Sequence, residues 1–468
     1  MPQSLLPFIV STLNGVLILH LLLPPKTLTG ALKIGLGFGL GLGLSAYVTF
    51  LSFILFNHLR VGFVQGLHMG LLILLFLWGV RRLYRHAPPK VSLRSLPYKE
   101  ALGLGLLTVA AIPLWQQAQF YPFGGWDAWS TWNLKAKFLF LAGSKWQHML
   151  SPSLWRSSPH YPLLLPLINV WGWSFHPTPL ETTPLLTACG FTLMTGWILL
   201  SGVKKYTGTF WGLLPALFWM SNPFLQKLAF SQYADNVLAY YLLAGVICLF
   251  LARKTETSPL LAGLAGSFLG MASFVKSEGV VAAALFFLLG TLDLWLNLST
   301  DKRKAAITAF WIGAGLAALP TVYFKLVYSP GNQTLINGLT SIEAPSTIKR
   351  LKITLGFALV EMFSLGWNLV CFLYPQRGLD YLEMKWSGIW VFLVVLALWT
   401  HKRSFQRDLW MIPMFFGLYG GICVFYYYFN TYFPIEWWLQ VTLSRVLSAV
   451  LPLGLFWACC VIQPPRNP

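Results

Sequence analysis

The chain has 468 residues, of which 56% are hydrophobic and only 10% carry a charge at neutral pH. Soluble domains average about 45–50% apolar and about 25% charged residues, so a soluble, disordered or collagen-like protein is excluded. The net charge of +19 is spread over short basic runs between apolar segments. This pattern argues against a nucleic-acid partner and predicts contact with membrane lipids.

Long apolar runs follow one another along the whole chain and predict an all-α polytopic membrane protein. Several of them exceed the roughly 18 residues that cross a bilayer, so we expect about eleven to fourteen transmembrane helices, with interfacial helices in a large first outer loop. The topology of two weaker runs, 162–175 and 351–373, stays open. The clear runs lie near 4–24, 31–56, 63–80, 100–116, 184–203, 208–229, 236–252, 259–275, 279–297, 305–327, 386–400, 409–428 and 443–462.

Residues 1–99 are predicted to hold N-terminal transmembrane helices and a basic cytoplasmic loop. The first run has no basic segment before it and no small-residue cleavage site after it, so we interpret it as a span rather than a signal peptide. The glycine-rich stretch GLGFGLGLG at 35–43 lies inside an apolar run and predicts close helix packing. The basic cluster that follows predicts a cytoplasmic loop; its members are Arg81, Arg82, Arg85, Lys90 and Arg94.

Residues 100–330 are predicted to form the functional module, and their longest polar interval, 117–160, is then on the outer face. In this interval Asp127 follows two glycines and is flanked by Trp126 and Trp129. With Trp132, these tryptophans recur every three residues, which predicts indoles along one side of a short interfacial helix. A carboxylate beside aromatic rings at the membrane boundary suits a general base for a hydroxyl, although an N-cap is an equal alternative.

Three further polar positions are expected on the same face. Asp235 opens a later apolar run, again as a functional carboxylate or an N-cap. Lys276 and Glu278 lie in a turn between two runs, where a lysine suits a phosphate and a structural salt bridge is the alternative. Lys135 or Lys137 is expected close to Asp127.

The end of the outer loop and the C-terminal region contribute the last candidates. His160 and Tyr161 precede a proline-rich apolar run, and a lone histidine there is more often structural than a ligand. Residues 331–468 are predicted to hold C-terminal helices that complete the site. Arg445 lies in the first turns of the last run, where an arginine either reaches lipid head groups or clamps a phosphate.

Taken together, these segments resemble the GT-C class of polytopic glycosyltransferases, within the branch of protein O-mannosyltransferases and lipid A aminoarabinose transferases. The resemblance rests on GWDAWSTWNLKAKFLF around Asp127 and on PHYPLLLP from 159. It also rests on QYADNVLAYY around Asp235, FVKSEG around Lys276 and TLSRVLSAVLPL around Arg445. It covers most of the chain in layout, and the Trp-Asp-Ala-Trp segment is its most distinctive part.

The resemblance implies an inverting glycosyltransferase, of the EC 2.4 type, that uses a polyprenyl-phosphate-linked sugar. Asp127 is then the catalytic base, and Lys276 and Arg445 bind the donor phosphate. The acceptor is the hydroxyl of a glycan, a lipid or a protein, at the periplasmic or exterior face of a bacterial inner membrane. Residues expected to position the acceptor or the sugar are Asp235, Glu278, His160, Tyr161, Trp126 and Trp129.

No cofactor is expected, and a metal-independent reaction is favoured, although a divalent cation stays compatible. The reason is that metal-using relatives depend on clustered carboxylates, whereas here Asp127 is followed by Ala128. Two alternatives remain. An enzyme like the O-antigen ligases or polymerases would rely on Arg156, His148 and His160. A lipid-linked sugar transporter or flippase would carry out no chemistry, but charges at mid-span and internal repeats, which transporters favour, are not evident in the sequence.

Overall fold

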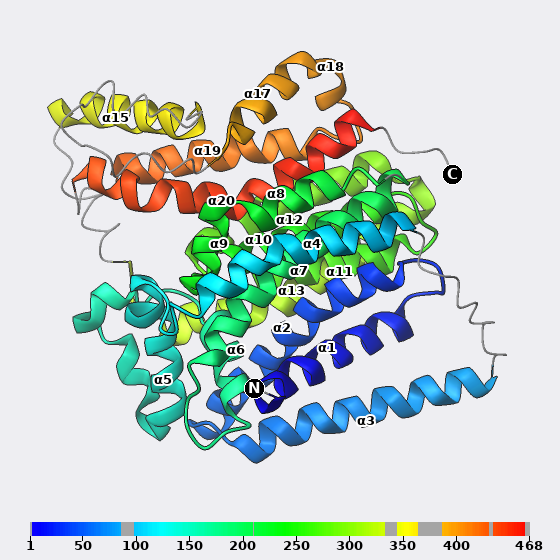
Figure 1. Ribbon diagram of the computed structural model, residues 1–468, viewed down its shortest axis with the longest axis vertical. Helices are drawn as coiled ribbons and strands as arrows, with labels where there is room; N and C mark the ends of the chain where they lie inside the picture. The colour runs from blue at the N-terminus through cyan, green and yellow to red at the C-terminus, as the bar shows by residue number, and fades with distance from the viewer. Residues whose placement is uncertain are drawn as a thin grey trace.

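The computed structural model describes residues 2–85, 98–208, 210–332, 344–363, 386–429 and 434–463. Within these ranges the protein is all-α, without a strand, and most of its long helices run side by side (Figure 1). Nine helices in the described ranges are long and apolar enough to cross a membrane. The prediction of an all-α polytopic membrane protein is therefore confirmed.

The nine spanning helices alternate with other helices, most of which are shorter. The spanning set is α1 (Pro2–Leu22), α2 (Gly30–Phe56), α3 (Val61–Arg85), α7 (Thr182–Thr207), α10 (Asp235–Ala252), α12 (Ser277–Asn297), α13 (Thr300–Tyr323) with η4 (Phe324–Tyr328), α19 (Met411–Phe429) and α20 (Ile435–Ile462). The others are α4 (Tyr98–Ala118), η1 (Ala128–Trp132), α5 (Asn133–Leu141), η2 (Gly143–Leu150), η3 (Pro152–Ser157), α6 (Leu164–Trp173), α8 (Leu213–Ser221), α9 (Pro223–Phe230), α11 (Ser258–Ser273), α15 (Ala344–Phe363), α17 (Ile389–Trp399) and α18 (His401–Ser404).

Against the eleven to fourteen spans expected, nine full-length spans lie in the described ranges, where several further apolar runs form shorter helices. The run 208–229 is interrupted at Pro223, where Asn222 caps a new helix by accepting a hydrogen bond from the Leu225 N–H (3.1 Å). The run 162–175 forms the ten-residue α6, which is wholly buried rather than interfacial. Of the run 351–373, α15 ends at Phe363, and the remainder lies outside the described residues.

The core is built around α10, in which every residue is buried, while α2 and α11 pack beside it. The glycine-rich stretch of α2 packs closely, as predicted. A Cβ atom on Gly41 would lie 1.7 Å from the Ser11 carbonyl oxygen of α1. The Tyr241 hydroxyl donates to the Gly39 carbonyl at 2.8 Å, so the missing side chains of α2 also admit the tyrosines of α10.

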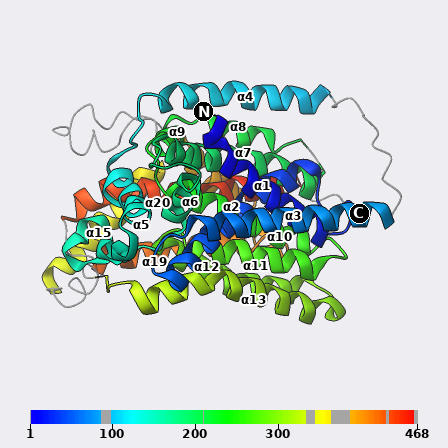
Figure 2. The same ribbon diagram turned by 90° about the horizontal axis from the view of Figure 1, so that it is seen from below.

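Helices at the edge of the bundle show the opposite pattern and expose apolar side chains. Leu74 on α3 and Leu316 on α13 are each about two-thirds exposed, at 67% and 65%. Figure 2 shows α4 and α13 at opposite edges of the bundle, so apolar surface surrounds it. Such faces suit lipid rather than water, which is why a core helix and a lipid-facing helix are equally apolar in sequence.

The two ends of the bundle differ in charge. In Figure 1, α3 and α20 both run from the side of the bundle that holds α5 to the opposite side. Of the two, α20 ends near the C label. At that opposite end, Arg253, directly after α10, makes a bidentate ion pair with Asp293 of α12, at 2.6 and 2.7 Å, and Lys302 pairs with Glu256 at 2.6 Å. The α5 end holds the predicted outer loop and the predicted site residues.

Candidate active site

Five charged side chains form one continuous chain of ion pairs at the α5 end, and we call them the ion-pair cluster. Arg445 of α20 contacts Asp127 through Nη1 at 2.7 Å and Asp235 through Nη2 at 3.1 Å. Asp235 also accepts a hydrogen bond from Lys276 at 2.6 Å, and Lys276 lies 3.2 Å from Glu278. All five residues were predicted from the sequence as site residues, and the structure brings them together.

A docked loop holds Asp127 beside Asp235. Gly124 adopts a left-handed φ of +72°, and the Gly125 N–H donates to the Ser231 carbonyl at 2.9 Å. The Gln232 side chain in turn accepts a hydrogen bond from Asn133 at 2.7 Å. The start of the outer loop is therefore tied on both sides of Asp127 to the turn before α10. Left-handed backbone favours glycine, which explains the glycine before this carboxylate.

Neither aspartate acts as a helix cap, so that alternative is wrong for both. Asp127 precedes η1 with helical backbone angles and makes no capping hydrogen bond. Asp235 is the first residue of α10, after the N-cap residue Ala234, and its carboxylate accepts hydrogen bonds from Lys276 and Arg445. Their carboxylates point to Arg445, because an ion pair is a stronger partner for a carboxylate than a backbone amide. The alternative for Lys276 and Glu278, a turn held by a salt bridge, is present alongside the wider cluster.

The cluster runs from the surface into the interior and back. The side chains of Asp127 and Glu278 are 31% and 28% exposed, Arg445 is 18% exposed, and Asp235 is fully buried. Burial lowers the pKa of Lys276, but Asp235 and Glu278 outweigh it, so this pKa lies above its usual value. Three carboxylates against two cations leave the cluster with one net negative charge.

Tyr233 completes the cluster and was not predicted. The Arg445 guanidinium lies over its ring at 4.3 Å, which adds a cation–π contact on the side not taken by carboxylates. Burial first, and then the nearby Asp127, raise the pKa of Tyr233 above its usual value. Its only sequence signal was an aromatic residue two positions before Asp235.

The tryptophans around Asp127 divide into an exposed and a buried set. Trp126 and Trp129 are 58% and 49% exposed and meet edge to face at 4.4 Å. Trp132 is buried, so the prediction that all three indoles share one side is wrong for it. The segment from Ala128 is a π-helical turn, in which the Asn133 N–H reaches the Ala128 carbonyl, and this wider turn changes the angular step per residue.

His160 and Tyr161 lie beside the cluster, on loop 158–161. Trp132 stacks on Tyr161 with ring centroids 5.6 Å apart. Burial raises the pKa of Tyr161, and the negative charges of Glu278 and Asp127 raise it further. The Tyr161 hydroxyl is therefore close enough to the cluster to be affected by its charges. Lys135, expected near Asp127, instead donates to the Ser158 carbonyl at 2.6 Å. Among the described residues, neither Lys135 nor the exposed Lys137 forms an ion pair with Asp127, whose carboxylate contacts Arg445.

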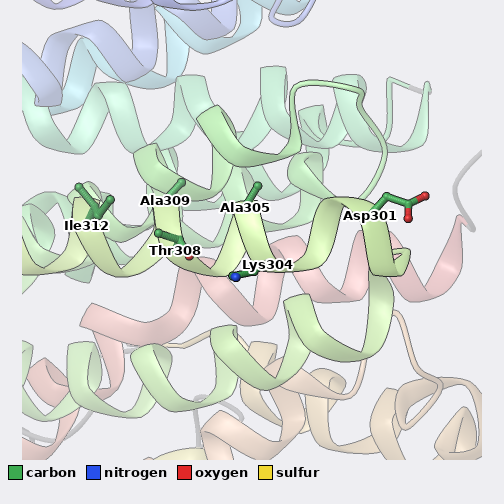
Figure 3. Close-up of a pocket in the computed structure, with 6 residues that line it drawn as sticks. All are labelled: Asp301, Lys304, Ala305, Thr308, Ala309 and Ile312. Carbon is green, nitrogen blue, oxygen red and sulfur yellow. The ribbon is translucent and has the colours of Figure 1, made fainter.

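The described surface also has a groove, and none of the predicted site residues line it. A shallow groove of about 590 Å³ runs along the first half of α13, at the opposite end of that helix from the cluster (Figure 3). Its lining combines one acid and one lysine with small or apolar side chains, from Asp301 to Ile312. Within the described ranges, no group of three or more His, Cys, Asp and Glu side chains is arranged to hold a metal ion.

The chain matches no protein-family model, no curated protein sequence and no solved structure.

Proposed function

We propose that this protein is an inverting glycosyltransferase that moves a sugar from a polyprenyl-phosphate carrier to an acceptor hydroxyl, with Asp127 as general base. One observation carries the proposal: Arg445 contacts Asp127 and Asp235 at the same time. Asp127, a carboxylate able to take a proton, thus lies 2.7 Å from Arg445, a cation able to bind a departing phosphate. Both groups are partly exposed at one end of a membrane-embedded bundle.

The reaction needs a base and a cation on opposite sides of the anomeric carbon. The acceptor oxygen attacks that carbon while its proton passes to an Asp127 carboxylate oxygen. The bond from the anomeric carbon to the phosphate oxygen breaks, and its electron pair leaves on the phosphate. Positive charge at that oxygen stabilises the departing group, which is a role that suits Arg445. A single displacement of this kind inverts the anomeric configuration.

Arg445 also couples donor binding to the freeing of the base. Its Nε and Nη2 atoms donate to Asp235, whereas Nη1 contacts Asp127. A phosphate that takes Nη1 replaces Asp127 there and releases its carboxylate for the acceptor. Asp235 meanwhile keeps the guanidinium oriented. Lys276 is 4% exposed and already holds two carboxylates, so we assign it mainly to fixing Asp235.

The remaining assignments follow from exposure. Trp126 and Trp129 present exposed ring faces near Asp127, which suits contact with a sugar or a prenyl chain. Glu278, which lies 3.2 Å from Lys276, is assigned with Tyr161 and His160 to positioning the acceptor or the sugar. We place the protein in a bacterial inner membrane, with the cluster facing the periplasm or the exterior.

The test uses the purified full-length protein in lipid nanodiscs, a panel of polyprenyl-phosphate-linked sugars and a cell-envelope extract as acceptor. Release of polyprenyl phosphate is measured, because it does not depend on knowing the acceptor. Asp127→Asn is expected to reduce release by about 10²–10⁴-fold, the usual effect of losing a general base. The matched control is Asp301→Asn, which changes an exposed acid at the far end of α13 and is expected to leave release unchanged.

Three results would contradict the proposal. Asp127→Asn protein that releases polyprenyl phosphate within about tenfold of wild type removes the base assignment. Activity that survives Asp127→Ala but is lost in Arg156→Ala or His160→Ala points to a ligase-like enzyme. Vesicle transport of the lipid-linked sugar without any glycosyl product points to a flippase.

A further inference from the structure

Two lysines from distant elements converge on loop 158–161 beside the ion-pair cluster. Lys135 of α5 donates to the carbonyls of Ser158 and Tyr161, at 2.6 and 3.4 Å. Lys325 of η4 donates to the carbonyl of His160, which also accepts from the Ser329 hydroxyl at 3.3 Å. Three carbonyl groups of one short loop thus accept hydrogen bonds from two lysine side chains.

These lysines differ from the cations of the ion-pair cluster in having no carboxylate partner. None of the ion pairs between described residues includes Lys135 or Lys325. Lys135 is fully buried, and its Nζ lies 5.8 and 5.7 Å from the ring centroids of Trp132 and Tyr161. An unpaired charge in such surroundings is expensive, and carbonyl dipoles compensate it only in part.

The electrostatics of His160 report the same excess of positive charge. Burial, then Lys325, then Lys135 lower the pKa of His160 to about 3. Burial and the charge of Lys325 likewise hold the pKa of Lys135 well below its usual range. No carboxylate offsets either shift, whereas every cation of the ion-pair cluster has one. A bound anion would offset the charge of Lys325 and favour the ammonium form of Lys135.

The position of this pair is suited to a ligand. Lys325, His160 and Ser329 are half-buried, so their side chains are open to a ligand. Lys135 is fully buried. Lys325 lies at the end of a spanning helix, in a π-helical turn, a feature that is frequent at functional sites. Loop 158–161 continues to Leu164, whose N–H donates to the Phe274 carbonyl at 2.9 Å, two residues before Lys276. The lysine pair and the ion-pair cluster are therefore neighbours.

We propose that Lys325, backed by Lys135, forms an oxyanion subsite at His160 that binds a phosphate-type group separate from the one assigned to Arg445. Two sources share this chemistry: a second phosphate on the lipid carrier, or an acidic group on the acceptor. The subsite does not depend on glycosyl transfer, because binding alone defines it. Ser329 is assigned as an additional hydroxyl donor to the bound oxyanion.

The experiment measures binding of inorganic phosphate to the full-length protein in phosphatidylcholine nanodiscs, by calorimetry without any sugar donor. Wild type is expected to bind, and Lys325→Met to bind about tenfold more weakly or worse, the usual effect of losing a charged hydrogen bond. Lys325→Arg keeps the charge and is expected to retain binding. The matched control is Lys137→Met, which removes an exposed lysine two residues from Lys135.

A second measurement separates ligand binding from a purely structural role of the lysine. The protonation midpoint of His160, followed by nitrogen NMR of histidine-labelled protein, is expected to rise by about one pH unit or more when phosphate is added, since a nearby anion favours imidazolium. His160→Gln identifies the signal. The measurement remains informative if Lys325→Met folds poorly, because it uses the wild-type protein.

The outcomes decide the proposal and its source. Competition for phosphate by a polyprenyl diphosphate, and not by the monophosphate, assigns the subsite to the lipid carrier, whereas competition only by a soluble sugar phosphate assigns it to the acceptor. The proposal is overturned if wild type binds no phosphate, or if Lys325→Met binds it as wild type does. Loss of binding in Arg445→Met alone would also overturn it. None of these results depends on turnover, so a failure of the transferase proposal is seen separately, in Asp127→Asn.

Discussion

Asp235 and Asp293 are two buried carboxylates that form a matched pair for testing the ion-pair cluster. Asp235 accepts hydrogen bonds from Lys276 and, twice, from Arg445, at 2.6, 3.1 and 3.2 Å. Asp293 accepts two from Arg253, at 2.6 and 2.7 Å, and one from Asn297, at 3.1 Å. Both side chains are fully buried, but only Asp235 belongs to the proposed active site.

Replacing either aspartate by asparagine keeps the shape and removes the charge. Breaking a buried ion pair costs about 3–5 kcal/mol, because the partner charge is left uncompensated. We expect Asp235→Asn near the lower limit, since Arg445 and Lys276 each keep a second carboxylate, Asp127 and Glu278. Asp293→Asn is expected nearer the upper limit, because no other carboxylate in the described ranges pairs with Arg253.

The free energy of unfolding of each variant is measured by denaturant titration in mixed micelles, and release of polyprenyl phosphate in nanodiscs. Both variants are expected to lose stability, whereas only Asp235→Asn is expected to lose release, because Arg445 is no longer oriented. The reasoning about buried charge fails if Asp235→Asn costs less than about 1 kcal/mol. The assignment of Asp235 to the site fails if the two variants release polyprenyl phosphate equally well.

Two further predictions concern the loop and the helix core. The folded-state pKa of His160 is about 3, below its ordinary 6.5, so only the unfolded chain binds this proton between those values. Stability should therefore fall as the pH drops below about 6.5, by up to about 1.4 kcal/mol per pH unit, and His160→Gln should flatten this slope in thermal unfolding at pH 4–7. An unchanged slope would refute the burial of a neutral His160. Gly41→Ala should lower the unfolding temperature, since the new methyl group would meet the Ser11 carbonyl. Gly66→Ala faces open space in a helix and should stabilise the fold by up to about 1 kcal/mol, which raises that temperature slightly, so equal effects of the two changes would contradict the packing argument.

Helices and membrane location could be predicted because both depend on local sequence. An apolar run long enough to cross a bilayer is helical wherever it is placed, since lipid leaves its backbone no other partner. The interruption at Asn222 and Pro223 also has a local signal, yet the length of the apolar run outweighed it in the prediction. The inward turn of Trp132 had no such signal, because a π-helical turn is not evident from residue spacing.

The sequence by itself determined which residues are chemically unusual here: only 10% of the chain is charged, so Asp127, Asp235 and Arg445 stood out against apolar surroundings. Only the tertiary structure decided which of them meet, since Asp235 and Arg445 are 210 positions apart and are joined by packing of α10 against α20. Lys325 shows the same limit, because a lysine at the end of an apolar run looks like an ordinary membrane anchor. Its pairing with Lys135 across loop 158–161 depends on long-range contacts, which no local pattern encodes.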